Sequence, residues 1–259
     1  MNKRSIFTTL IMLIIIPVIL SPLAGAGDIT QSEEFKEYWY SGTAELTSYK
    51  LKQSRYGEIH DGYVVMIFVT EDFSRSKQVK LDDPQSAGDD AVKVLKLNRV
   101  KKFDTGLYRY SMMDSVFTPV DTDAYPDTLK LSSSSQEWCG NTYTQLNLSG
   151  DKYDAKTFSY FESEGDKSFG LDKALLEDEL WTRIRLGPQN LPVGDVELIP
   201  GAMAARLMHR QLRVEPANAS LTDNEDDKTL YDYEIRYKDY ERTLKISFNR
   251  SFPYEIESW

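Results

Sequence analysis

The sequence predicts a mainly β protein of the α+β class: a curved antiparallel sheet or half-barrel packed on one long amphipathic helix. Aromatic and β-branched residues fall on alternating positions in many short segments, as is typical of strands, and the chain holds 16 Tyr and 11 Phe. Turn residues separate these segments, and few segments carry helical spacing. Strands joined by short turns form antiparallel sheet, and an amphipathic helix must cover its apolar side.

The strands begin with a predicted hairpin that joins residues 43–56 to residues 63–69. The run from Tyr63 to Val69 is continuously apolar, which predicts a strand buried on both faces. Near the end of the chain, alternating apolar residues predict a hairpin of residues 231–237 and 244–248. Further strands are expected over residues 92–102, 107–118, 128–138, 143–148, 153–162, 193–199 and 206–221.

Two segments carry helix signals. The long helix is expected over residues 171–186, and Gly187 with Pro188 would end it. Its apolar face would hold Leu171, Leu175, Trp181 and Ile184. A shorter helix is expected over residues 32–40, because Ser32 is a good N-cap and acidic residues follow it in the first turn.

The first 26 residues have the order of a cleavable signal peptide. Two basic residues precede an apolar run from Ile6 to Leu20, and Ala24 and Ala26 occupy the positions that must be small. Cleavage would leave residues 27–259 as a single β-rich exported domain, periplasmic or secreted. Retention as an anchor is the alternative, but the run is shorter than the roughly 20 residues of a membrane span. No other stretch is long enough, so we expect no integral membrane span after cleavage.

Charge and cysteine content exclude several classes of partner. Without Lys3 and Arg4 the chain has 29 basic and 41 acidic residues, a net charge of −12. Such a surface repels phosphate backbones and anionic head groups, so we expect no nucleic-acid partner. A single cysteine, Cys139, allows no internal disulfide and no Cys-based structural zinc site. Phosphate loops and dinucleotide fingerprints are absent, and we expect no cofactor and no metal.

Cys139 is one of two features with chemical potential. It follows Trp138, and the simplest interpretation is a small apolar residue that packs beside that ring. The alternative is a nucleophile, which would need His60 or His209 as a base.

Clustered carboxylates are the other feature. Glu162, Glu164 and Asp166 alternate at the end of an expected strand, and four more acids fill the loop 223–227. Either cluster offers oxygen ligands for Ca²⁺, and a pair of acids can perform glycosidic acid–base chemistry. Neither has the spacing of an EF-hand.

Several motifs resemble those of a group of exported bacterial proteins of unestablished function that are often labelled "septum formation inhibitor Maf". They cover residues 70–73, 77–80, 136–140, 159–164 and 252–259, so the resemblance spans nearly all of the expected mature chain. The Ser- and Arg-containing motif of the Maf nucleotide pyrophosphatases is missing here, so the resemblance implies export without a mechanism. The order of elements is also similar to exported half-barrel lipoprotein carriers, a likeness of fold alone.

The function most consistent with these features is a non-catalytic binding or carrier module for an apolar or glycan ligand, since a concave aromatic face suits both. Its partner would be a lipid, a glycan or an envelope protein. The expected ligand-binding residues, where the motifs meet, are Trp138, Cys139, Tyr160, Glu162 and Glu164. The alternative is a hydrolase of envelope polymers that uses carboxylates or the single Cys. No residue is assigned a catalytic role.

Overall fold

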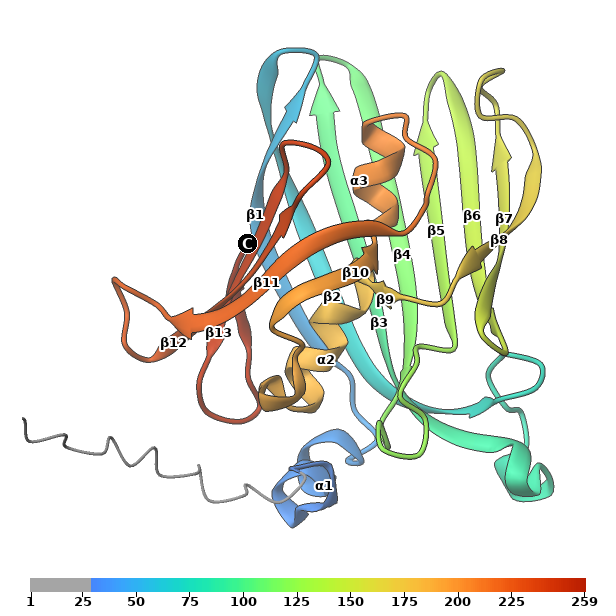
Figure 1. Cartoon of the computed structure of the whole chain (residues 1–259), viewed down its shortest axis with the longest axis vertical. Coiled ribbons are helices and arrows are strands. Elements are labelled where there is room, and N and C mark those ends of the chain that lie inside the picture. The colour runs from blue at the N-terminus through green and yellow to red at the C-terminus, as the bar shows by residue number, and fades with distance from the viewer. Residues whose placement is uncertain (1–28) are drawn as a thin grey trace, which may run out of the picture.

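The computed structural model describes residues 29–259, and the signal peptide expected at residues 1–26 lies outside the described residues. The described chain is mainly β and contains an eight-stranded antiparallel sheet and a curled six-stranded half-barrel sheet. Figure 1 shows the second sheet lying across one face of the first, while strands β6 to β8 extend beyond it. The predicted fold class is therefore confirmed in its coarse form.

The eight-stranded sheet is a meander in which each strand pairs with the next. Its strands are β1 (Glu45–Arg55), β2 (Glu58–Ser74), β3 (Ala91–Thr105), β4 (Tyr108–Pro119), β5 (Lys130–Glu137), β6 (Gly140–Ser149), β7 (Lys152–Ser159) and β8 (Lys167–Asp172). The first hairpin turns at Tyr56 and Gly57, whose φ angles of 54° and 82° are the left-handed backbone conformations that match a two-residue hairpin loop to the right-handed twist of its strands.

The six-stranded sheet has the order β14-β13-β12-β11-β10-β9, and only its β9–β10 pair is parallel. Its strands are β9 (Leu175–Leu176), β10 (Gly194–Ile199), β11 (Glu215–Asp223), β12 (Leu230–Tyr237), β13 (Thr243–Asn249) and β14 (Ile256–Ser258). The predicted hairpin of residues 231–237 and 244–248 is confirmed as β12 and β13, whose alternating apolar side chains are buried.

Two strand predictions are wrong in part. The run from Tyr63 to Val69 is not buried on both faces, because β2 pairs β1 and β3 but has one face toward solvent, where Tyr63 is 45 % exposed. Residues 206–214 do not continue a strand, because helix α3 (Ala202–Leu207) and a connecting segment precede β11. The small residues Ala202, Ala204 and Ala205 favour a helix there.

The predicted long helix is wrong. Residues 171–186 divide into the end of β8, the short strand β9, a 3₁₀ turn (Glu177–Glu179) and a seven-residue helix, α2 (Leu180–Leu186). Apolar spacing alone does not distinguish these elements, because buried strands and helices both carry leucines and the pairing of β8 with β7 decides the outcome. The short N-terminal helix is confirmed as α1 (Glu33–Trp39), capped by the Ser32 hydroxyl, which accepts from the Phe35 amide at 3.1 Å.

The 3₁₀ turn consists of three consecutive buried acids, Glu177, Asp178 and Glu179, here called the buried acid trio; each is at most 5 % exposed. Each acid has partners from other elements. Glu177 accepts from Tyr237 of β12 and from Arg242 in the turn between β12 and β13, and Arg242 Nη2 lies 2.6 Å from its Oε1.

The other two acids of the trio bind the first sheet and α3. Asp178 accepts from Arg99 of β3 and from the backbone amide of Ala202, both at 2.7 Å. Glu179 accepts from the Thr128 hydroxyl and lies 3.3 Å from Arg183. The trio therefore connects the two sheets and holds the start of α3.

On the inner face of β5 to β8, the side chains are apolar toward one end of the strands and carry hydroxyl groups toward the other. Toward one end, Leu131, Leu146 and Ala155 occupy one cross-strand row and pack into the main core. Two residues further along, the same face carries Ser133, Ser135, Thr142, Thr144, Thr157 and Ser159, here called the hydroxyl ladder. The second sheet covers the apolar end, which leaves the hydroxyl ladder for other elements to cover.

Among residues 29–259, no helix has the length and apolar content needed to cross a membrane.

Candidate functional site

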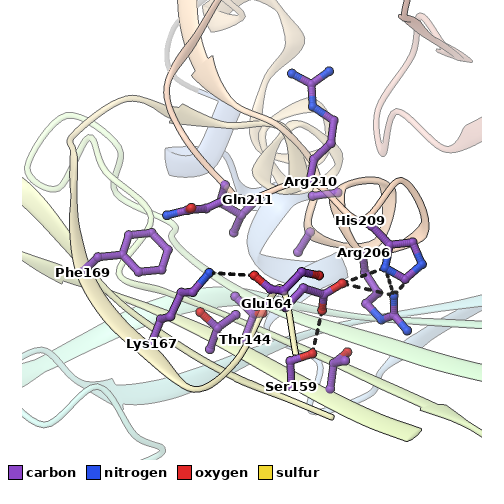
Figure 2. Close-up of a pocket in the computed structure, with 15 residues that line it drawn as sticks. Thr144, Ser159, Glu164, Lys167, Phe169, Arg206, His209, Arg210 and Gln211 are labelled. Carbon is purple, nitrogen blue, oxygen red and sulfur yellow. Dashed lines mark hydrogen bonds and ion pairs between the residues drawn. The ribbon is translucent and has the colours of Figure 1, made fainter. Parts of the chain in front are cut away.

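A pocket of about 200 Å³ lies between β6–β8 and helix α3 with the segment that follows it. The hydroxyl ladder forms one wall of this pocket, contributing Thr142, Thr144, Thr157 and Ser159. Figure 2 shows Arg206, His209, Arg210 and Gln211 on the other side of the pocket, with Lys167 and Phe169 of β8 at one end. Hydroxyl, cationic and aromatic side chains thus meet in one small cavity.

The register of the sheet brings the hydroxyls together. Thr144 pairs with Thr157, and Thr142 pairs with Ser159, so the four side chains form two adjacent cross-strand pairs on one face. The hydroxyls of the three threonines have no hydrogen-bond partner among residues 29–259, whereas Ser159 donates to Glu164 at 2.7 Å. Three hydroxyls are therefore free to bind a ligand or water.

Glu164 is the carboxylate of the pocket. It lies in the turn between β7 and β8, and His209 Nδ1 lies 2.7 Å from its Oε1. Partial burial acts to raise the pKa of Glu164, but the Ser159 hydroxyl, His209 and Arg206 outweigh it and hold that pKa below its ordinary value. Glu164 is therefore ionised at neutral pH and held by partners that leave it little freedom to act as an acid.

Helix α3 positions the cationic side of the pocket. Arg206 forms an ion pair with Glu137 of β5 and stacks over the ring of Phe161, with 4.5 Å between guanidinium carbon and ring centroid. His209 follows the helix with a φ of 53°, a left-handed conformation that costs energy for a residue with a side chain. This backbone conformation ends the helix and turns the imidazole toward Glu164.

Three cationic side chains lie around the pocket, and two of them form ion pairs with carboxylates. Lys167, Arg206 and Arg210 line it, against the single carboxylate of Glu164. Arg206 and Arg210 are paired with Glu137 and with Glu215, which lies 3.1 Å from Arg210. Lys167 has no ion pair among the described residues and donates only to the Ser163 carbonyl at 3.2 Å. Its charge is therefore available to an anionic ligand.

The residues expected from the sequence lie around this site. Glu164 lines the pocket itself, and Trp138, Cys139 and Tyr160 line a neighbouring hollow that shares Thr142 and Ser159 with it. Glu162 is exposed and lines neither hollow. The acids 162, 164 and 166 also do not share one face of a strand, because β7 ends at Ser159 and the chain turns back at Gly165.

The neighbouring hollow is built on exposed rings. Trp138 is 70 % exposed and Tyr160 is 71 % exposed. The Tyr160 ring lies against Gly140, where an added Cβ would be 2.6 Å from a ring carbon, so a larger residue at this position would displace the Tyr160 side chain. Cys139 is exposed rather than packed in a core, and its backbone amide donates to the Tyr108 hydroxyl at 2.6 Å.

Neither histidine contacts Cys139 among the described residues. His209 is bound to Glu164, and His60 is a strand residue of β2 whose Nε2 lies 3.2 Å from the Arg55 carbonyl. No group of three or more His, Cys, Asp or Glu side chains in residues 29–259 is arranged to hold a metal ion.

Sequence reasoning missed most of the pocket. Lys167 and Arg206 lie outside the motifs recognised in the sequence, and the threonines are separated along the chain. One available signal was the Thr-x-Thr spacing of Thr142 and Thr144, which puts two hydroxyls on the same strand face as Leu146.

Comparisons of the chain with protein-family models, with curated proteins and with solved structures found no match.

Proposed function

We propose that this protein is a non-catalytic binding module for a sugar acid, taken up in the pocket between the hydroxyl ladder and α3. The observation that carries the proposal is a set of three unpartnered threonine hydroxyls beside an unpaired lysine in a small cavity, where Lys167 is the cross-strand neighbour of Thr157. Sugar hydroxyls exchange hydrogen bonds with Thr side chains, and a carboxylate forms a charge-assisted bond with an ammonium group.

Phe169 and the neighbouring hollow support a glycan rather than a small inorganic anion. Phe169 lines the pocket beside Lys167 and offers a ring face to the apolar side of a sugar (Figure 2). The exposed rings of Trp138 and Tyr160 extend this surface around the end of the sheet, since both hollows share Thr142 and Ser159. An oligomer would therefore contact more of the protein than a single sugar.

The lining favours binding over hydrolysis. Glycosidases require two carboxylates on either side of the bond that breaks. Among the described residues, Glu164 is the one carboxylate that lines the pocket, and it is already held by Ser159 and His209. The export signal expected at residues 1–26 is consistent with an envelope or extracellular glycan as the source of the ligand.

The test is calorimetric titration of the protein with a short oligomer of galacturonic acid and with the matching neutral oligomer of galactose. We expect saturable binding of the acidic oligomer and much weaker binding of the neutral one. Lys167→Gln should remove this preference, whereas Lys156→Gln, on the exposed opposite face of the adjacent strand, should leave it unchanged.

Two results would contradict the proposal. Equal affinity for both oligomers in the unmodified protein would show that Lys167 recognises no carboxylate. Release of new reducing ends during incubation with the oligomer would show a hydrolase, and Glu164→Gln would then identify whether the pocket is its active site.

A further inference from the structure

Helix α3 separates the sugar-acid pocket from a second hollow, a cleft of about 490 Å³ between the two sheets. Ala202 and Ala205 of the helix line the pocket, whereas Met203, Ala204 and Leu207 line the cleft. This division follows from the helical period, because residues at i and i+3 share a face and the intervening residues point elsewhere. The cleft is therefore a distinct site with its own lining.

Part of the cleft lining is apolar, and the rest is polar or charged. Met203 and Leu207 lie on one side, and Leu244 of β13 lies on another. Trp181 and Trp259 close the cleft with rings packed edge to face, 5.2 Å between centroids. The volume is within the range of roughly 300–1,000 Å³ that is typical of small-molecule sites.

One ammonium group in this cleft forms no ion pair with a described carboxylate. Lys101 of β3 donates to the side-chain oxygen of Gln53 at 3.1 Å, and no ion pair joins it to any described carboxylate. Burial, and then the charge of nearby Arg99, lowers the pKa of Lys101 to about 8. Lys101 is therefore still mostly protonated at neutral pH. The nearby carboxylates of Asp114 and Asp178 favour its charged form, but both are paired with Arg99 and neither forms an ion pair with Lys101.

The other charged groups around the cleft are already paired. Arg99 is bound by Asp114 and Asp178, each at 2.7 Å. Arg242 is bound by Glu177, and Lys245 lies 2.8 Å from Asp232. Among the charged groups that line the cleft, Lys101 is therefore the one that forms no ion pair with a described residue.

We propose that the cleft binds the anion of a single-chain fatty acid, with the carboxylate on Lys101 and the hydrocarbon chain between Trp181, Leu207 and Leu244. A carboxylate supplies the missing partner of the ammonium group, and a charge-assisted hydrogen bond in a partly dry site is stronger than one in water. The hydrocarbon chain removes apolar wall from water. This site goes beyond the sugar-acid pocket and does not depend on it.

Tryptophan fluorescence gives a direct test, because Trp181 and Trp259 line the cleft. Dodecanoate that carries bromine on its chain should quench this fluorescence with saturation, and unlabelled dodecanoate should reverse the quenching. Lys101→Met should weaken dodecanoate binding about tenfold or more, as expected for loss of a hydrogen bond between charged groups. Binding of dodecanol, the uncharged counterpart, should change little.

Two further variants control for folding and position. Lys102→Met removes the adjacent lysine, whose position on β3 alternates to the opposite face, and should leave binding unchanged. Ala204→Phe fills the cleft from α3 and should abolish binding of both dodecanoate and dodecanol, with circular dichroism confirming the fold. The proposal is overturned if dodecanoate does not bind, if Lys101→Met binds it as well as the unmodified protein does, or if Ala204→Phe retains it. The galacturonate titration reports on the pocket alone, so each proposal can fail separately.

Discussion

The buried acid trio and the Glu164 cluster are two acidic sites that the same fold uses differently. Each acid of the trio is at most 5 % exposed and has at least two partners from other elements. Glu164 is partly exposed, accepts from one hydroxyl and one histidine, and lies beside threonines without partners. Fully paired buried carboxylates hold elements together, whereas a partly paired carboxylate beside free donors is characteristic of a binding site.

The two sites should differ most in their contribution to stability, which is tested by removing one charge from the trio. Glu177→Gln leaves Arg242 without its carboxylate and weakens the hydrogen bond from Tyr237. We expect the free energy of unfolding to fall by about 3 kcal/mol, because loss of one partner leaves a largely buried charge uncompensated. Urea denaturation measures this, and Glu37→Gln on the exposed face of α1 should change it by less than about 0.5 kcal/mol.

Equal effects of Glu177→Gln and Glu37→Gln would show that the trio contributes no more to stability than a surface acid.

A second prediction concerns the pH dependence of the trio. Burial and the neighbouring Asp114 raise the pKa of Asp178 from 3.8 to about 7. The folded protein therefore retains a proton that the unfolded chain releases above about pH 4. The contribution of this proton to stability is complete below that pH and is lost as the pH rises through about 7, with a slope of at most about 1.4 kcal/mol per pH unit.

Asp178→Asn removes this titration. The difference in unfolding free energy between the unmodified protein and the variant should decrease as the pH rises from about 4 to about 7. If this difference in unfolding free energy stays constant between about pH 4 and about pH 7, Asp178 titrates over the same pH range in the folded and unfolded states.

Glu164 should behave in the opposite way. Its folded pKa is lowered, so its contribution to stability is present above its ordinary pKa and is lost as the pH falls through the folded value. Glu164→Gln should reduce the unfolding free energy by no more than about 1 kcal/mol, since partly exposed ion pairs contribute little. It should also strengthen galacturonate binding, because it removes the one described carboxylate that lines the pocket. Weaker binding would mean that Glu164 contacts the ligand.

The smallest expected change in stability comes from the hydroxyl ladder. Thr144→Val replaces an unpartnered hydroxyl by a methyl group of similar shape, so the free energy of unfolding should change by less than about 0.5 kcal/mol. Affinity for both the galacturonate and the galactose oligomer should fall, because the lost hydrogen bond is to a sugar hydroxyl. Unchanged affinity with unchanged stability would leave Thr144 outside the binding surface.

Local patterns predicted much of the sheet structure but little of the site. The hairpin of β12 and β13 was predictable because its alternating apolar residues match the two-residue period of a strand. The segment 171–186 was not, because its leucines fit a helix as well as a strand, and pairing of Leu171 and Leu175 with distant strands decided between them. Glu164 was one of the predicted ligand-binding residues. Its partner His209 was not, because it lies 45 residues away in a segment expected to be a strand.

The sequence by itself determined that this chain is mainly β, that residues 231–237 and 244–248 form a hairpin and that Ser32 caps α1, because these properties depend on residues close together along the chain. Only the tertiary structure decided which face of β6 and β7 became a pocket wall and which cations lie opposite it. Thr142 and Ser159 become neighbours through strand register, and Arg206 reaches them because the trio fixes α3 through the Ala202 amide. Contacts between residues so far apart depend on the packing of the whole chain, which local residue patterns do not encode.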